Sequence, residues 1–166
     1  MSDMRTLPQA GQYPPIAATD MLELGKAAEH IVCADLMLAG YRAFLSDQGL
    51  PYDVVIDHGG RLVRVQVKST MRPKNANAAG RSPNWVYQFH ARRRGKESRG
   101  ERLSEKHCDL IAFVALDIRI VAYLPVRDVA QTVSLFPPGF KFAGKYKRSR
   151  RVSIEGFKIE GALAKC

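Results

Sequence analysis

The sequence predicts an α/β domain built around a mixed β-sheet. The 166 residues, 46% hydrophobic and 25% charged, have the composition of a soluble globular chain. One helical segment precedes a glycine-linked hairpin, and further apolar strands and a last helix follow. A chain of this length buries roughly 68–70% of its unfolded surface, so its core needs neither disulfides nor a metal.

The first elements are an arm and a helix. Residues 1–16 contain three prolines and no periodicity, and we expect a flexible N-terminal arm. Thr19 is expected to cap the helix, with Asp20 and Glu23 in the first turn, where carboxylates interact well with the helix dipole. Gly40 is expected to end it.

Short apolar runs after the helix predict a series of strands. Residues 58–60, His-Gly-Gly, link two of these runs and predict an antiparallel hairpin. Residues 70–84 are expected to form a loop, 125–133 a last helix, and the chain beyond 136 an irregular segment. The expected strands are 41–45, 53–57, 61–69, 85–90, 108–116 and 118–124. We divide the chain into the arm 1–16, a domain 17–135 and a basic C-terminal segment 136–166.

The charge distribution predicts a polyanionic partner. The net charge is +10 and the pI is near 9.8. Residues 71–106 hold ten basic and three acidic residues, and residues 141–166 hold eight and two, which leaves the rest of the chain slightly acidic. Two basic segments on an acidic body favour nucleic acid. The alternative is a solvated basic surface that maintains solubility.

Cysteine usage and the N-terminus predict a cytoplasmic protein. The three cysteines, Cys33, Cys108 and Cys166, are far apart, and no CxxC or Cys/His ligand spacing occurs. We therefore expect reduced thiols and no structural zinc. The N-terminal residues lack the apolar stretch of a signal peptide. No apolar run is long enough for a membrane helix, so no membrane partner is expected.

Polar residues in apolar surroundings predict a metal site. Alternation along 61–69 directs the valines at 63, 65 and 67 to one face and Gln66 and Lys68 to the other. Asp53 opens the preceding strand, and Glu29 lies on the apolar-rich helix. Burying such groups without partners costs about 1–3 kcal/mol each. Two carboxylates, an amide oxygen and an ammonium in one corner would suit Mg²⁺. The alternative is that Gln66 and Lys68 are solvated and Glu29 is an ordinary surface acid.

These residues resemble a known nuclease pattern. The branch of the PD-(D/E)xK nuclease superfamily in which glutamine replaces the second acid has the arrangement found here as Glu29…Asp53-x12-Gln66-Val67-Lys68. Residues 22–128 resemble small bacterial endonucleases akin to group I intron homing enzymes. The proline of the motif precedes Tyr52 instead of Asp53, and Gln66 stands where most members have an acid. The resemblance implies a restriction-endonuclease-like core, a mixed β-sheet flanked by helices.

The resemblance also implies a mechanism and a substrate. Asp53, the amide oxygen of Gln66 and the Val67 carbonyl would hold Mg²⁺, for which Mn²⁺ would substitute, with Glu29 completing the shell directly or through water. The ion would polarise the scissile phosphate. Lys68 would orient or deprotonate the attacking water. The activity implied is that of a Mg²⁺-dependent endodeoxyribonuclease of homing or restriction type, acting on double-stranded DNA. Because one active site cuts one strand, a homodimer or homotetramer is expected.

Basic residues outside this corner are expected to contact the DNA backbone without selecting bases. They are Arg72, Lys74, Arg92, Arg93, Arg94, Lys96, Lys145, Lys147, Arg148, Arg150 and Arg151. Three alternatives remain open: an enzyme resembling Holliday-junction resolvases, a catalytically silent nucleic-acid-binding module on the same fold, and a basic ribosome- or protein-associated factor. In the last, the four polar residues would be incidental.

Overall fold

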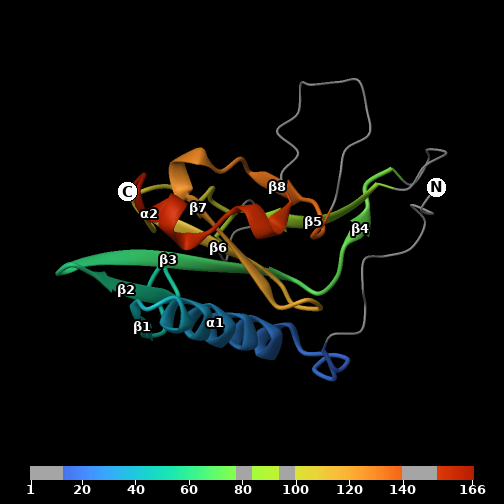
Figure 1. The fold of residues 1–166 in the computed structure, drawn as a ribbon, viewed down its shortest axis with the longest axis horizontal. Helices are drawn as coiled ribbons and strands as arrows, with labels where there is room; N and C mark the ends of the chain where they lie inside the picture. Colours follow the sequence, from blue (N-terminus) through green and yellow to red (C-terminus); the bar gives the residue numbers. More distant parts are fainter. Residues whose placement is uncertain (1–12, 78–83, 94–99, 140–152) are drawn as a thin grey trace.

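The computed structural model describes residues 13–77, 84–93, 100–139 and 153–166. Its centre is a five-stranded sheet in the order β1-β2-β3-β6-β7 (Figure 1). Strands β3 and β6 run parallel, and the other neighbouring pairs are antiparallel. The strands are β1 Arg42–Leu45, β2 Val54–His58, β3 Arg61–Thr70, β6 Leu110–Ala115 and β7 Ile120–Pro125. The α/β class and the mixed sheet predicted from the sequence are therefore confirmed.

Helix α1, Met21–Leu38, packs along one face of this sheet (Figure 1). Its N-cap is Asp20, whose side chain accepts the Leu22 N–H at 2.7 Å. The prediction that Thr19 caps the helix was wrong by one residue, because the carboxylate of Asp20 reaches a free N–H of the first turn. Gly40 follows the helix with φ +90°, a conformation that glycine adopts readily.

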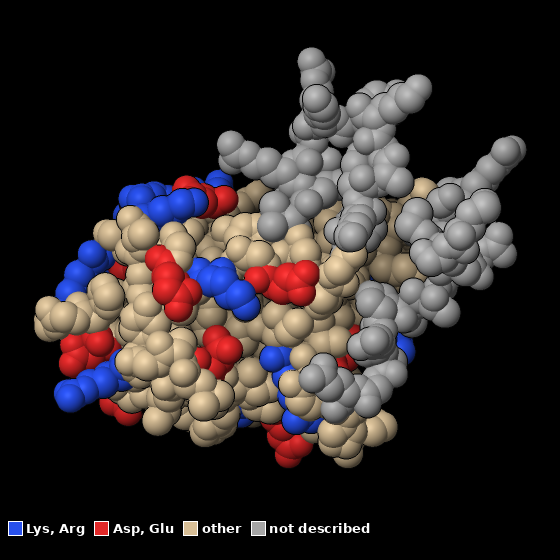
Figure 2. Space-filling view, viewed as in Figure 1, with Lys and Arg blue, Asp and Glu red and all other residues tan. Residues whose placement is uncertain are grey.

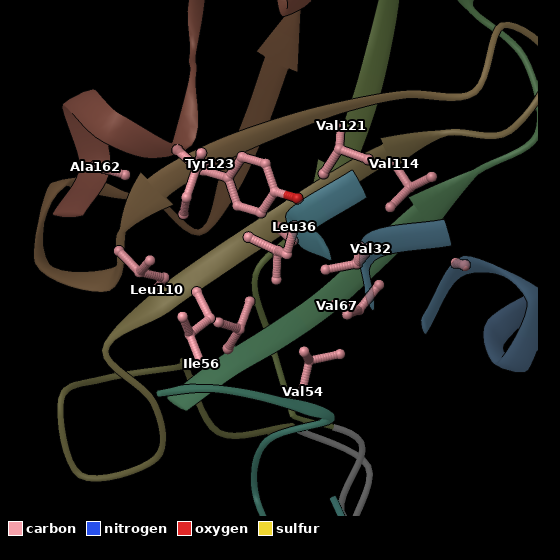
Figure 3. Packing of buried hydrophobic residues seen from close by; sticks show 14 of the residues in the cluster. Val32, Leu36, Val54, Ile56, Val67, Leu110, Val114, Val121, Tyr123 and Ala162 are labelled. Atoms are coloured by element: carbon pink, nitrogen blue, oxygen red, sulfur yellow. The ribbon is translucent and has the colours of Figure 1, made fainter. Parts of the chain in front are cut away.

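The strand alternation divides the core into two clusters, one on each face of the sheet. The first joins α1 to the sheet and to the C-terminal helix α2, Ile159–Leu163 (Figure 3). Its buried residues include Leu24, Ala28, Val32, Leu36, Val54, Ile56, Val63, Val65, Val67, Leu110, Val114, Tyr123 and Ile159. Val67 thus lies in the core between Gln66 and Lys68, which are only partly buried. The predicted alternation of the hairpin strand is confirmed.

A second sheet covers the other face. Strands β4 Lys74–Asn75, β5 Trp85–His90 and β8 Thr132–Leu135 form an antiparallel sheet in the order β4-β5-β8. It buries a cluster against β6 and β7 that contains Tyr87, Phe89, Ile111, Phe113, Ala122, Val126, Leu135 and Ile154. Lys74 and Asn75, predicted to lie in a loop, pair with Val86 and Trp85.

The helix predicted at 125–133 is wrong. The chain forms a single 3₁₀ turn, η1 Val126–Asp128, and then strand β8, which pairs with β5. Val129, Thr132 and Val133 are β-branched and suit a strand better than a helix when a partner strand is present.

The chain beyond 136 is more regular than predicted where the structure describes it. Residues 153–166 form the 3₁₀ turn η2 Ile154–Gly156 and helix α2. Ile154 belongs to the second core cluster, and Ile159 and Ala162 belong to the first. These residues therefore pack into the same core as the segment before 136.

Two sets of polar contacts stabilise the sheet and its packing against α1. The guanidinium of Arg64 on β3 contacts both carboxylate oxygens of Asp109 at 3.2 and 2.9 Å, and its backbone N–H donates to Asp109 at 2.8 Å. Burial would raise the pKa of Asp109, but the hydrogen bonds from Arg64 outweigh it and lower that pKa. The Tyr123 hydroxyl donates to Asp35 of α1 at 2.7 Å. Strand β3, on which the candidate site depends, is thus fixed against β6.

No helix in the described part of the chain combines the length and the apolarity needed to cross a bilayer.

Candidate active site

The candidate site lies where the hairpin of β2 and β3 opens. The last paired residues of this ladder are Val54 and Val65, and the Asp53 N–H still donates to the Val65 carbonyl at 2.9 Å. One step further, the Val67 N–H donates to Oδ2 of Asp53 at 2.7 Å. The side chain of Asp53 thereby takes the place of the next backbone partner. The two strands part at this carboxylate and leave it fixed at the fork.

Neighbouring residues hold Asp53 on three sides. Its carbonyl accepts the Ser46 N–H at 2.9 Å, and the Ser46 hydroxyl donates to the carbonyl of Tyr52. The amide nitrogen of Gln66 donates to Oδ2 of Asp53 in a short contact. Asp53 therefore reaches its position through bonds to the end of β1, to β3 and to the side chain that the sequence analysis paired with it.

Burial, one hydrogen bond and three charged neighbours act on the pKa of Asp53. Burial raises the pKa of this carboxyl, and the hydrogen bond from Val67 lowers it. The negative charge of Glu29 raises the pKa further, while the positive charges of Lys68 and Lys26 lower it. The net direction is upward. Glu29 and Lys68 thus lie close enough to Asp53 to act on it, so the structure brings the four predicted residues into one electrostatic environment.

Glu29 and Asp53 also line one cleft. The cleft has a volume of about 550 Å³ and lies between α1 and the segment that joins β1 to β2. Its wall on α1 includes Leu22, Lys26 and Glu29, and Asp53 lies on the opposite wall. The Glu29 side chain is 19% exposed and forms an ion pair with the Nζ atom of Lys26 at 3.3 Å. Gln66 and Lys68 are not among the lining residues; Gln66 contacts Asp53, which does line the cleft.

Lys26 is the residue of this corner that the sequence analysis missed. It precedes Glu29 by three residues and therefore lies beside it on one side of the helix. The sequence shows this spacing. It indicates a functional role for Lys26 only together with the position of Asp53 in the same cleft.

The donor atoms at the fork suit a hard divalent cation. The Gln66 amide nitrogen lies 3.5 Å from the Val67 carbonyl oxygen and also contacts Asp53, so an amide, a carbonyl and a carboxylate meet at one point. A half-turn of the amide would exchange its nitrogen for its oxygen at this point. Three oxygen donors with Glu29 nearby are typical of Mg²⁺ or Ca²⁺ sites. Among the described residues no three His, Cys, Asp or Glu side chains gather for a metal, so such a site needs the amide and the carbonyl.

The predicted DNA-contacting residues are only partly described. Arg72, Lys74, Arg92 and Arg93 are exposed; Arg72 follows β3, Lys74 begins β4, and the last two follow β5. On the face shown in Figure 2, described basic and acidic side chains lie side by side and form no single-sign patch. The other predicted contacts lie outside the described residues: Arg94, Lys96, Lys145, Lys147, Arg148, Arg150 and Arg151.

Comparisons with known proteins identify the family and agree with the fold. The family model for the PD-(D/E)XK endonuclease matches residues 19–136, more than half of the chain. The solved structure of a bacterial homing endonuclease is similar with a TM-score of 0.61 and 19% sequence identity, over 88% of this chain and 93% of that chain. At that identity the similarity concerns the fold. No curated protein matches the chain in a sequence comparison.

The raised pKa of Asp53 predicts that its charge opposes folding. A folded state with a raised carboxyl pKa binds the proton more readily than the unfolded chain. Its contribution is present at low pH and is lost as the pH rises through the folded-state pKa. Asp53→Asn keeps an acceptor for the Val67 N–H and removes the charge. We expect its free energy of unfolding at pH 7, without divalent metal, to equal that of the parent within about 1 kcal/mol or to exceed it.

Denaturant unfolding in EDTA at pH 4 and pH 7 measures this difference. The stability of Asp53→Asn relative to the parent should increase from the lower to the higher pH. Asp128→Asn, a change at an exposed ion pair with Lys165, is the control and should show little trend. A variant destabilised by more than about 2 kcal/mol at pH 7 would mean that the ionised carboxylate is a net stabiliser of the fold.

Proposed function

Since the chain belongs to the PD-(D/E)XK endonuclease family, we propose that it hydrolyses phosphodiester bonds of double-stranded DNA with the help of a divalent cation, Mg²⁺ or, in its place, Mn²⁺. The observation that carries this proposal is the fork at Asp53. There a fixed carboxylate, the Gln66 amide and the Val67 carbonyl meet, with Glu29 and Lys68 within electrostatic reach.

We assign the roles from this arrangement. Asp53, the amide oxygen of Gln66 and the Val67 carbonyl would hold the cation, with Glu29 completing the set. When bound, the cation supplies Lewis-acid polarisation of the phosphate and neutralises charge on the leaving oxygen. Lys68 orients the attacking water and stabilises the charge that develops on the phosphoryl oxygens. The hydrogen bond from Val67 keeps Asp53 in place throughout.

The proposed substrate explains the charge of the chain. DNA carries regularly spaced phosphates, and the exposed Arg72 and Lys74 continue from the strand that carries Lys68. Because one site cuts one strand, a double-strand break would require a homodimer or homotetramer. Site specificity of the homing or restriction type is part of the proposal, with action on a four-way junction as its variant.

A catalytically silent DNA-binding module is the second candidate. The observation that favours it is the orientation of Gln66, whose amide nitrogen contacts Asp53. In a silent module this hydrogen bond would be permanent and would occupy the carboxylate. Incubation of plasmid DNA with Mg²⁺ or with EDTA separates the two candidates, because only the nuclease cuts and only in Mg²⁺.

Lys68→Ala should abolish cleavage and leave DNA binding intact, because we expect the ammonium to act mainly on the transition state. We expect the single-turnover rate on plasmid DNA in Mg²⁺ to fall by about 10²–10⁴-fold, with DNA affinity in Ca²⁺ changed less than about threefold. Lys106→Ala, an exposed lysine outside the site, is the control and should cut at the parent's rate. Near-parental cutting by Lys68→Ala would remove this residue from the mechanism.

Substitutions at Gln66 test whether its amide oxygen is a ligand. Gln66→Glu adds a third carboxylate, so the half-maximal rate should occur at a lower Mg²⁺ concentration than in the parent. Gln66→Leu keeps the volume but removes the oxygen and should be inactive. Titration of Mg²⁺ against the initial cleavage rate compares the three proteins. A leucine variant with the parent's metal dependence would show that Gln66 is not a ligand.

The basic residues between 145 and 151 are expected to add affinity without chemistry. Each phosphate contact adds about −0.9 to the slope of log K against log salt. Deleting the C-terminal segment is a poor test, because Ile154, Ile159 and Ala162 are buried in the core. Replacing Lys145, Lys147, Arg148, Arg150 and Arg151 by glutamine should instead flatten the slope and leave the single-turnover rate at saturating DNA unchanged. An unchanged slope would assign the segment another role.

A further inference from the structure

Lys26 has a position that the proposed function does not explain. It lines the cleft together with Glu29 and Asp53, and its Nζ atom lies 3.3 Å from Oε2 of Glu29. The Lys26 side chain is 48% exposed, whereas that of Glu29 is 19% exposed. The lysine is therefore the more accessible member of the pair to anything that enters the cleft.

Helix stability is a weak reason for this ion pair. In helices the favourable order places the acid before the base, and here Lys26 precedes Glu29. A pair in this order contributes little to an isolated helix. The pair is better explained by what it faces, because both of its members line the cleft that contains Asp53.

The residue before Lys26 in α1 is a glycine, Gly25. Gly25 lies within α1, where glycine is disfavoured. A Cβ atom at Gly25 would meet nothing within 4 Å, so no packing inside the chain requires glycine there. Close approach of the backbone to a ligand is one of the situations in which glycine is used. Gly25 is three residues after Leu22 and four before Glu29, and both of these neighbours line the cleft.

We propose that Lys26 is a substrate-positioning residue, which neutralises Glu29 in the metal-free protein and binds a phosphate of the DNA backbone once a divalent cation occupies the site. This inference rests on the proposed function. Without metal, Lys26 and Lys68 balance the carboxylates of Glu29 and Asp53. Glu23 and Asp47 also line the cleft, and a bound divalent cation neutralises two of its negative charges, so Glu29 no longer needs Lys26. The flexible ammonium is then free to turn to an incoming phosphodiester.

Competition between Lys26 and the cation for Glu29 makes the first test. Lys26→Gln removes the charge, so Ca²⁺ alone should bind the full chain more tightly, by about two- to fivefold as expected for an exposed ion pair. Lys26→Arg keeps the charge and should behave as the parent does. Lys106→Gln removes an equal charge from an exposed position that does not line the cleft and should leave the Ca²⁺ affinity unchanged. Calorimetric titration without DNA measures all four proteins.

DNA binding is the second test. Lys26→Gln should lower the DNA affinity, whereas it raises the Ca²⁺ affinity in the first test. With a defined duplex in Ca²⁺, Lys26→Gln should bind more weakly and lose about 0.9 from the salt slope, the value of one phosphate contact. Lys26→Arg should restore the slope. A slope and a Ca²⁺ affinity for Lys26→Gln that match those of Lys106→Gln would overturn the inference, as would tighter Ca²⁺ binding with an unchanged slope.

The proposed function and the role of Lys26 can be refuted separately. If the parent cuts DNA in Mg²⁺ and binds Ca²⁺, but Lys26→Gln changes neither Ca²⁺ affinity nor the salt slope, only the role of Lys26 is refuted. If the parent neither binds Ca²⁺ nor cuts DNA, the proposed function is refuted and the role of Lys26 with it.

Discussion

The hydrogen bond from the Val67 N–H to the Asp53 carboxylate is the constraint on which the site depends. It replaces a backbone rung by a side chain and so ends the β2–β3 ladder. Beyond this point β3 continues alone beside β6, and the carboxylate stays at the fork. Because Val67 points into the core, its neighbours Gln66 and Lys68 must project from the other face of the strand. This bond fixes Asp53 against β3, and the alternation of the strand places Gln66 and Lys68 beside it.

This arrangement keeps charge in a place where burial opposes it. The pKa of Asp53 is raised by burial and by Glu29, and only the Val67 hydrogen bond and two lysines act the other way. A core residue with these properties would be a liability for folding. Departures of this kind from the rules of stable folding gather at functional sites, where the bound ligand supplies the missing compensation. The proposed cation supplies positive charge to the carboxylates, and the phosphodiester supplies negative charge to the lysines.

The rest of the fold keeps this corner rigid. Arg64 and Asp109 join β3 to the start of β6, and Tyr123 joins β7 to Asp35 of α1. Cluster packing on both faces holds β6 in place, and residues of α2 complete one of those clusters. The cleft wall that carries Glu29 is consequently fixed against the sheet that carries Asp53. Positioning of this kind is what phosphoryl chemistry requires of a protein.

The sequence by itself determined the features that depend on local periodicity. The helix, the hairpin at 58–60 and the alternation that separates Gln66 and Lys68 from the valines follow from neighbours a few residues apart. Strand β8 and helix α2 were not predicted, because each is stabilised by contacts with distant parts of the chain. The fork at Asp53 and the meeting of Lys26 with the cleft were likewise decided by the tertiary structure. The Asp53–Val67 hydrogen bond joins residues that are 14 positions apart in the sequence. The two walls of the cleft belong to different elements. Both features form only when the sheet and α1 pack.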